Sequence, residues 1–213
     1  MTIAADELCL PVLAARDLCL DQLRQLEVAE EDATLTANTL LEASLRGVDS
    51  HGIALLPIFA ERIRSGQIKP GRVAFVRREG LTTAWVDGQH GMGPPLATAA
   101  MALAARKARQ YGLGAVSLYD GNYVGALASY VEGPARDGLI ALAMANATPR
   151  VAPHGGCQGL HGTNPIAWAA PATDGEPLLF DAATGNAAAR LSQAAEEGQS
   201  IGLGTALDSA GQP

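Results

Sequence analysis

Cysteine and paired histidine are scarce in this sequence, and their scarcity excludes two kinds of architecture. The three cysteines show no Cys-x-x-Cys spacing, and an odd number does not suit a disulfide framework. The four histidines form no pair at helix-face spacing and no His-Glu-x-x-His motif. We therefore expect neither a disulfide scaffold nor a metal site.

Long apolar runs and clusters of basic residues are also missing. No stretch approaches the roughly 18 consecutive apolar residues of a membrane span, so we expect no membrane insertion. The first residues show neither the basic region nor the continuous apolar segment of a secretory signal, which predicts a cytoplasmic protein. The net charge is −7 and the basic residues are scattered, so nucleic acid is not an expected partner.

The apolar residues that are present repeat at spacings typical of an α/β protein. Helical spacing predicts helices over 12–26, 32–45 and 56–63, so residues 1–70 are expected to form an N-terminal helical region. From 71 to 213 strand-like and helix-like segments alternate, which predicts an α/β region with a mixed sheet flanked by helices. The expected strands are 73–76, 82–86, 115–118, 139–144, 166–170 and 178–180, and the expected helices are 95–111, 125–136 and 186–197.

A glycine-rich loop precedes the alanine-rich helix expected at 95–111. From Gly88 to Gly93 it reads Gly-x-x-Gly-x-Gly, whereas the dinucleotide-binding fingerprint is Gly-x-Gly-x-x-Gly. The acidic residue that should close a second strand about 20 positions further on is also missing. We therefore interpret the loop 88–93 as a structural turn.

The segment from Leu45 to Gly52 places a carboxylate, a hydroxyl and an imidazole on consecutive residues, Asp49, Ser50 and His51. We expect a loop that leads into a helix start, where free N–H groups and the helix dipole favour a neutral imidazole. A neutral histidine accepts a proton from a substrate hydroxyl and, once charged, returns one to a carbonyl or imine. His51 is therefore the first candidate for a catalytic acid or base.

Structural interpretations of the same segment stay open beside the catalytic one. Asp49 or Ser50 could be an N-cap, and a histidine next to a helix start is often a hydrogen-bonded structural residue. A serine hydrolase is excluded, since its nucleophile motif requires glycine where this chain has Val48. A triad within Asp49-Ser50-His51 is not expected either, because adjacent side chains point apart.

A series of segments spread over nearly the whole chain resembles the malate/L-lactate dehydrogenase family, whose members lack a Rossmann fold. The group contains ureidoglycolate, sulfolactate and some malate dehydrogenases, diketogulonate reductase and cyclic imino-acid reductases. In chain order the segments are Leu45-Arg46-Gly47-Val48-Asp49-Ser50-His51-Gly52, Val86-Asp87-Gly88 with Gly91 and Gly93, Gly121-Asn122-Tyr123-Val124-Gly125, Gly162-Thr163-Asn164-Pro165-Ile166-Ala167 and Phe180-Asp181-Ala182-Ala183-Thr184.

The resemblance implies an atypical α/β fold that binds NAD or NADP, with a small 2-hydroxy, 2-oxo or imino acid as substrate and a homodimer as the assembly. His51 matches the family's Ser-His-Gly histidine, with Ser50 and Tyr123 in the same catalytic site. Thr163 and Asn164 match the turn near the substrate carboxylate. The implied cofactor contacts are Asn122, Ala147, Asp181, Ala182 and Ala183.

Some positions differ from the family pattern. Many relatives have a second histidine where this chain has Tyr123, and tyrosine donates hydrogen bonds but is a poor base at neutral pH. An arginine that clamps the substrate carboxylate often stands where this chain has Leu55. Relatives also continue well beyond the match to Pro213. The alternative is therefore a truncated, catalytically weak or inactive relative that acts as a binding or dimerisation module, and a separate C-terminal half is a further partner to consider.

Overall fold

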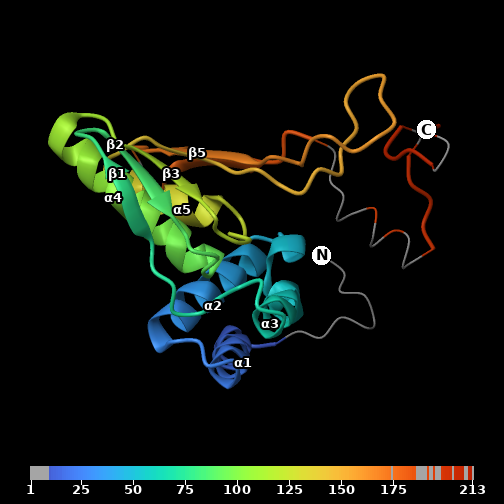
Figure 1. Cartoon of the computed structure of the whole chain (residues 1–213), viewed down its shortest axis with the longest axis horizontal. Helices are drawn as coiled ribbons and strands as arrows, with labels where there is room; N and C mark the ends of the chain where they lie inside the picture. The colour runs from blue at the N-terminus through green and yellow to red at the C-terminus, as the bar shows by residue number, and fades with distance from the viewer. Residues whose placement is uncertain are drawn as a thin grey trace. The chain divides into compact units, whose positions relative to one another are not determined.

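Two compact units make up the chain, Met1–Ser129 and Tyr130–Pro213 (Figure 1). The computed structural model describes residues 10–173, 175–185, 191, 194, 198–202, 204–208 and 211–212. The predicted division into 1–70 and 71–213 separates residues by the kind of secondary structure, and it stays a prediction. The expected helix 186–197 lies mostly outside the described residues.

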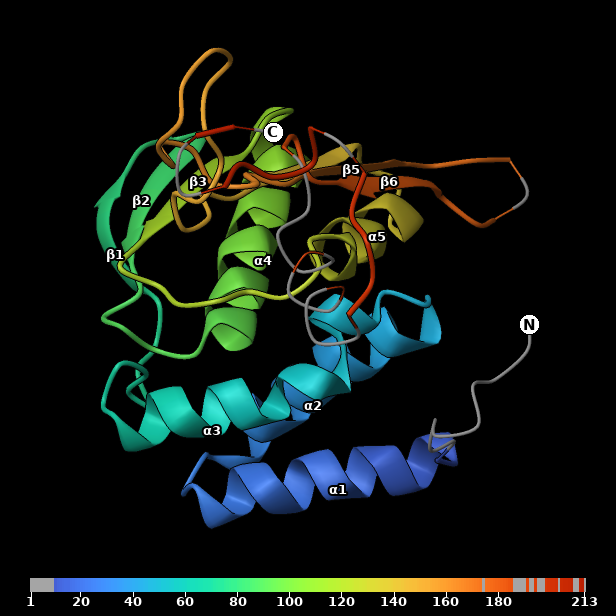
Figure 2. The ribbon, with the colours of Figure 1, turned by 90° about the vertical axis from the view of Figure 1, so that its right-hand side faces the viewer.

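Three helices open the first unit: α1 (Val12–Gln25), α2 (Glu30–Leu45) and α3 (Leu56–Arg64). They agree with the predicted helices to within a few residues. Helix α1 packs against α2 and α3 (Figure 2). Their apolar stripes close over a core in which Leu23, Leu40 and Phe59 are almost completely buried. The same core takes in Ile68 and Met92 from the loops that follow.

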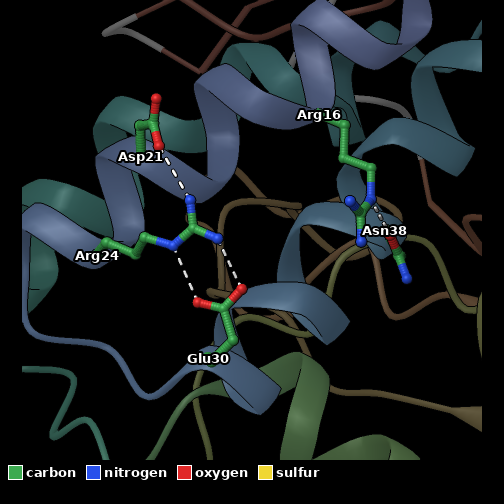
Figure 3. Close-up of polar contacts among 5 residues, drawn as sticks. All are labelled: Arg16, Asp21, Arg24, Glu30 and Asn38. Atoms are coloured by element: carbon green, nitrogen blue, oxygen red, sulfur yellow. Dashed lines mark hydrogen bonds and ion pairs between the residues drawn. The ribbon is translucent and has the colours of Figure 1, made fainter.

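Polar contacts on the surface join α1 to α2 (Figure 3). The guanidinium of Arg24 donates to both carboxylate oxygens of Glu30, at 2.9 and 2.7 Å, and to Asp21 at 3.0 Å. Further along the pair, Arg16 donates to Asn38 at 3.4 Å. The hydrogen bonds from Arg24 lower the pKa of the Glu30 carboxyl below its usual value. These groups are exposed, so the apolar core contributes far more stability than the ion pairs do.

A three-stranded mixed sheet follows, made of β1 (Phe75–Glu79), β2 (Thr83–Asp87) and β3 (Ala115–Tyr119) in that order. Strands β1 and β2 are antiparallel, whereas β2 and β3 are parallel because helix α4 (Gly93–Tyr111) connects them. Helix α4 covers one face of the sheet (Figures 1 and 2). The buried Lys107 ammonium of this helix binds Glu79 at 2.7 Å and the Gly80 carbonyl at 2.8 Å, which fixes α4 to the β1–β2 turn.

The opposite face of this sheet carries an aromatic and charged group of side chains. Arg77 donates two hydrogen bonds to one carboxylate oxygen of Asp87, at 3.1 and 2.8 Å, and lies over the Phe75 ring. Trp85 and Tyr119 make an edge contact beside them. The hydrogen bonds from Arg77, and one from the Gln89 N–H, lower the pKa of Asp87.

The second unit contains an antiparallel sheet of β4 (Ala141–Met144), β5 (Ile166–Ala170) and β6 (Leu178–Ala182), preceded by α5 (Ala128–Arg136), which starts in the first unit. Side chains alternate between faces: Ala167 and Ala169 are fully buried, while Leu142, Met144 and Leu178 are 53%, 69% and 60% exposed. Trp168 and Phe180 stack on this exposed face.

The predicted fold class is confirmed, with one refinement. The strands form two three-stranded sheets, of which the first is mixed and the second is antiparallel. Among the described helices, none combines the length and the apolar character that a membrane span requires.

Candidate functional site

The candidate histidine lies in a short irregular segment between α2 and α3. Gly47, with a φ of 73°, ends α2, and two 3₁₀ turns follow, Asp49–His51 and Ile53–Leu55. The His51 N–H donates to the Val48 carbonyl at 2.9 Å, so it is not one of the free amides of a helix start. The predicted helix-start environment of His51 is therefore wrong, because the 3₁₀ turns intervene before α3 begins at Leu56.

The N-cap interpretation of Asp49 and Ser50 finds no support among the described residues. The structure places Val48, Gly52 and Leu55 at the cap positions of the two turns and of α3, without a side-chain capping hydrogen bond. Instead, the end of α2 holds the segment: the Ser44 hydroxyl oxygen accepts a hydrogen bond from the Ile53 N–H at 3.1 Å.

Gly52 is the residue that permits this attachment. A β-carbon at position 52 would overlap the Ser44 hydroxyl oxygen and approach the Ser44 β-carbon to 3.1 Å. The backbone beside His51 is thus pressed directly against α2. The position of His51 in the chain is therefore fixed by contacts with α2 as well as by its connection to α3.

Ser50 and His51 contact each other directly. The Ser50 hydroxyl oxygen lies 2.9 Å from His51 Nδ1. The expectation that adjacent side chains point apart is wrong here, because that geometry belongs to an extended strand and these residues form a tight 3₁₀ turn. The contact holds Nδ1 beside the Ser50 hydroxyl and so orients the imidazole ring.

Tyr123 brings a distant segment of the chain to the same place. Its ring centroid lies 6.0 Å from that of His51 and 6.1 Å from that of Phe59, in an edge contact with the latter. The structure therefore joins the Ser-His-Gly segment and the Gly-Asn-Tyr segment, which are far apart in sequence. All three rings belong to the first unit.

Asn122 and the glycine-rich loop position Tyr123. The Asn122 side-chain nitrogen donates to the carbonyls of Gln67 at 3.0 Å and His90 at 3.3 Å. A β-carbon at Gly93 would overlap the Tyr123 carbonyl oxygen and come within 2.7 Å of the Asn122 carbonyl oxygen. The glycines of the loop 88–93 allow the segment around Asn122 to approach closely, and the interpretation of this loop as a structural turn stays a prediction.

A cavity of about 90 Å³ adjoins this arrangement. Tyr123 forms one wall, and α3 with its preceding turn forms most of the others. The residues lining it are Leu55, Ile58, Phe59, Arg62, Ile68 and Tyr123. Its lining is therefore mainly apolar and includes one charged residue, Arg62.

In the second unit, a compact turn holds the predicted substrate-binding residues. The Asn164 side-chain oxygen accepts a hydrogen bond from the Ala147 N–H at 3.0 Å. The Thr184 hydroxyl donates to the Asn164 carbonyl at 2.8 Å, and the Thr184 N–H donates to the Thr163 carbonyl at 2.9 Å. Asn164 has a positive φ of 35°, a conformation that asparagine tolerates better than most residues. These bonds bring Ala147, Thr163 and Asn164 together.

The predicted cofactor contacts on β6 lie at the same end of the second sheet. Asp181 pairs with Ala167 and Ala182 pairs with Ile166, two residues after Asn164. Gly162 completes the turn, since a β-carbon there would overlap the Ala147 carbonyl oxygen and approach Asn164 Oδ1 to 2.6 Å. The small side chains at 147, 182 and 183 would let a flat ligand such as a nicotinamide ring approach the chain closely, so the residues present fit that cofactor.

The predicted site residues thus form two groups, one in each unit. Ser50, His51, Asn122 and Tyr123 lie together in the first unit, and Ala147, Thr163, Asn164, Asp181, Ala182 and Ala183 lie together in the second.

Sequence reasoning did not identify Ser44 or the lining of the cavity. Helical spacing carried a usable signal, because Leu55, Phe59 and Arg62 recur at i, i+4 and i+7 and therefore share one face of α3 and its preceding turn. No comparable pattern marks Ser44, whose contact with Gly52 depends on the tertiary fold.

The amino-acid sequence is similar to those of known dehydrogenases over most of its length. Residues 11–213 match the family model for malate/L-lactate dehydrogenase. The malate dehydrogenase of Pyrococcus abyssi is 39% identical over 191 residues, which cover 89% of this chain and 52% of that protein. The (2R)-3-sulfolactate dehydrogenase (NADP(+)) of Chromohalobacter salexigens is 35% identical over 200 residues, which cover 93% of this chain and 60% of that protein.

A solved structure extends the similarity to the fold. The crystal structure of Δ1-piperideine-2-carboxylate reductase from Pseudomonas syringae pv. tomato matches with a TM-score of 0.90 at 33% identity, covering 97% of this chain and 63% of that chain. The chain spans about half the length of the curated relatives that it matches, 52% and 60% for the two above. Since the family model matches nearly the whole sequence, the chain belongs to the malate/L-lactate dehydrogenase family.

Proposed function

We propose that this chain belongs to an oxidoreductase that transfers a hydride between NAD or NADP and a small 2-hydroxy, 2-oxo or imino acid. The observation that carries the proposal is the pairing of the oriented imidazole of His51 with Tyr123 beside a small cavity. The names of the relatives support the same reaction class, since they include malate and sulfolactate dehydrogenases and a cyclic imino-acid reductase.

His51 is the proposed acid and base. The Ser50 hydroxyl orients the ring through Nδ1, and in the proposal the neutral imidazole accepts the proton of a substrate hydroxyl during oxidation. In the reverse direction the imidazolium returns that proton to the carbonyl oxygen or imine nitrogen. Tyr123 is the proposed hydrogen-bond donor of the site, because a phenol keeps its proton at neutral pH.

Nicotinamide cofactor supplies or accepts the hydride when it is bound. Ala147, Asp181, Ala182 and Ala183 are its proposed contacts, and the turn of Thr163 and Asn164 is the proposed partner of the substrate carboxylate. Any contact from Asn122 would use its side-chain oxygen, since its side-chain nitrogen donates to loop carbonyls.

A binding or dimerisation module is the second candidate function. The exposed apolar face of the second sheet, with Leu142, Met144 and Leu178, is typical of a surface that becomes covered by association. This face and the family resemblance support a homodimer. A dimer without cofactor binding would fit the second candidate alone.

Cofactor titration separates the two candidates. NADH and NADPH are titrated into the chain with nicotinamide fluorescence as the readout, and turnover is then measured with malate, lactate, 3-sulfolactate and Δ1-piperideine-2-carboxylate. We expect saturable binding of at least one cofactor and turnover of at least one acid. A folded chain, verified by circular dichroism, that binds neither cofactor would contradict the oxidoreductase and leave the binding module.

A further inference from the structure

Arg62 is the charged residue in the lining of the cavity beside Tyr123, and it is half-buried. Within the part of the chain that the structure describes, no ion pair or hydrogen bond engages its guanidinium. Two other arginines of the first unit have carboxylate partners: Arg24 binds Asp21 and Glu30, and Arg77 binds Asp87. A partly desolvated cation without an anionic partner is unfavourable unless a ligand provides one.

The cavity is connected to the proposed catalytic pair through Tyr123. The same tyrosine ring packs near His51 and forms a wall of the cavity. Phe59, which contacts that ring, lies three residues before Arg62 on α3. A ligand in the cavity would therefore lie next to the group proposed to move a proton.

We propose that Arg62 binds the carboxylate of the substrate, with the apolar walls enclosing the substrate's body. The inference depends on the proposed function for the identity of that acid. A guanidinium presents a planar set of donors and a positive charge, both of which match a carboxylate.

The chemistry of the walls narrows the substrate class. Apart from Arg62 and Tyr123, the lining is formed by leucine, isoleucine and phenylalanine residues. A second anionic group, as in malate or sulfolactate, would be desolvated against these side chains without a partner. The cavity favours a small monocarboxylate with an apolar body, such as a cyclic 2-imino acid or a short aliphatic 2-oxo acid.

Ligand binding tests the proposal without requiring turnover. Pyrrole-2-carboxylate, a planar monocarboxylate, is titrated calorimetrically against the wild-type chain and compared with neutral pyrrole-2-carboxamide and with malate. We expect the monocarboxylate to bind most tightly. Arg62→Gln should weaken its binding about 10- to 100-fold, the range for a charge-assisted hydrogen bond, without changing the affinity for the carboxamide.

Matched variants control for structural effects. Arg62→Lys keeps the charge and should retain part of the affinity. Arg64→Gln removes an exposed arginine from the same helix, outside the cavity lining, and should bind like the wild type. The comparison of carboxylate with carboxamide on the unmodified chain needs no variant, so poor folding of Arg62→Gln would not prevent the test.

Equal binding of the acid and the amide by the wild type, or unchanged acid binding by a folded Arg62→Gln chain, would overturn the proposal. Nicotinamide titration of the same variants distinguishes this failure from failure of the proposed function. If the chain binds a cofactor and its affinity for the acid does not depend on Arg62, the proposed role of Arg62 is rejected and the proposed oxidoreductase function is kept. Arg62-dependent acid binding without cofactor binding rejects the oxidoreductase and keeps the carboxylate site.

Discussion

The two groups of candidate site residues differ in the size of their side chains. In the first unit the site consists of large side chains, His51, Tyr123 and Phe59, whose rings contact one another around a cavity. In the second unit it consists of a turn whose backbone groups are held by Asn164 and Thr184, with alanine and glycine at its surface. The first group is thus proposed to act through its side chains, and the second is proposed to hold a ligand against small residues.

This difference determines how each site should respond to substitution. Removing a side chain from the first site removes a chemical function but leaves the surrounding core in place. Adding a side chain to the second site should distort the backbone geometry on which the proposed ligand contacts depend. The comparison therefore predicts that truncations disable the first site, whereas enlargements disable the second.

The largest effect is expected from His51→Ala. The substitution removes the proposed acid and base, and such groups typically contribute about 10²- to 10⁴-fold to the rate. Steady-state kinetics should show this loss in kcat, while circular dichroism and cofactor affinity stay unchanged. His154→Ala, which removes an exposed histidine of the second unit, is the control and should leave kcat unaltered. Retention of more than a few per cent of the activity by His51→Ala would assign the proton transfer to another group.

Gly162→Ala is expected to have the next largest effect, through the second site. The added β-carbon would displace the Ala147 carbonyl or the Asn164 amide, and overpacking of this kind costs about 1–3 kcal/mol of stability. Cofactor affinity should fall by about tenfold or more, since the distorted turn carries the proposed contacts. Fluorescence titration and thermal unfolding measure the two effects.

Gly133→Ala provides the matched control for that enlargement. Gly133 lies in α5 with open space around its α-carbon, so alanine there should raise stability by about 0.4–1 kcal/mol. If both glycine variants behaved alike in cofactor titration, the tight packing at position 162 would have no part in ligand binding.

Tyr123→Phe is expected to have a smaller effect than either. The phenyl ring keeps the contacts with His51 and Phe59, and only the hydroxyl is lost. A single hydrogen bond contributes about 1 kcal/mol, which corresponds to about fivefold in kcat/KM. A drop as large as that of His51→Ala would mean that the phenol itself transfers the proton.

Arg77→Gln should leave activity unaltered and change only the pH dependence of stability. Because Arg77 lowers the pKa of Asp87 in the folded chain, the pair stabilises the fold above the ordinary carboxyl pKa and loses this effect as the pH falls through the lowered value. The variant should raise the pKa of Asp87 and flatten the rise of unfolding free energy with pH in that window. Denaturant unfolding at several acidic pH values measures the slope, and an unchanged slope would contradict the assignment.

Much of the fold followed from local sequence patterns. The apolar spacing of α1, α2 and α3, the β-branched and aromatic run of β2, and the turn residues between strands predicted the elements to within a few residues. The separation of the strands into two sheets could not be predicted from these patterns. Which strands pair depends on tertiary packing, and this packing leaves no periodic pattern in the sequence.

The candidate site divides in the same way. His51 could be identified from its neighbours in sequence, whereas its contact with Ser50 was wrongly excluded because the 3₁₀ turn was not anticipated. Arg62 is one of two arginines on the last turn of α3, and only the packing of Tyr123 against that helix face separates it from exposed Arg64. Long-range contacts therefore decide which of several similar residues belongs to the site.

The contact between Ser44 and Gly52 has a consequence for redesigning this enzyme family member. Gly52→Ala alone collides with the Ser44 hydroxyl, and Ser44→Gly alone removes the acceptor of the Ile53 N–H. A β-carbon at position 52 therefore requires a smaller residue at position 44, and that smaller residue no longer accepts the hydrogen bond from the Ile53 N–H. The chain beside the imidazole is thus constrained by its contact with α2, whereas the cavity-lining residues Ile58 and Arg62 on α3 have no part in that contact and are the better positions for altering ligand preference.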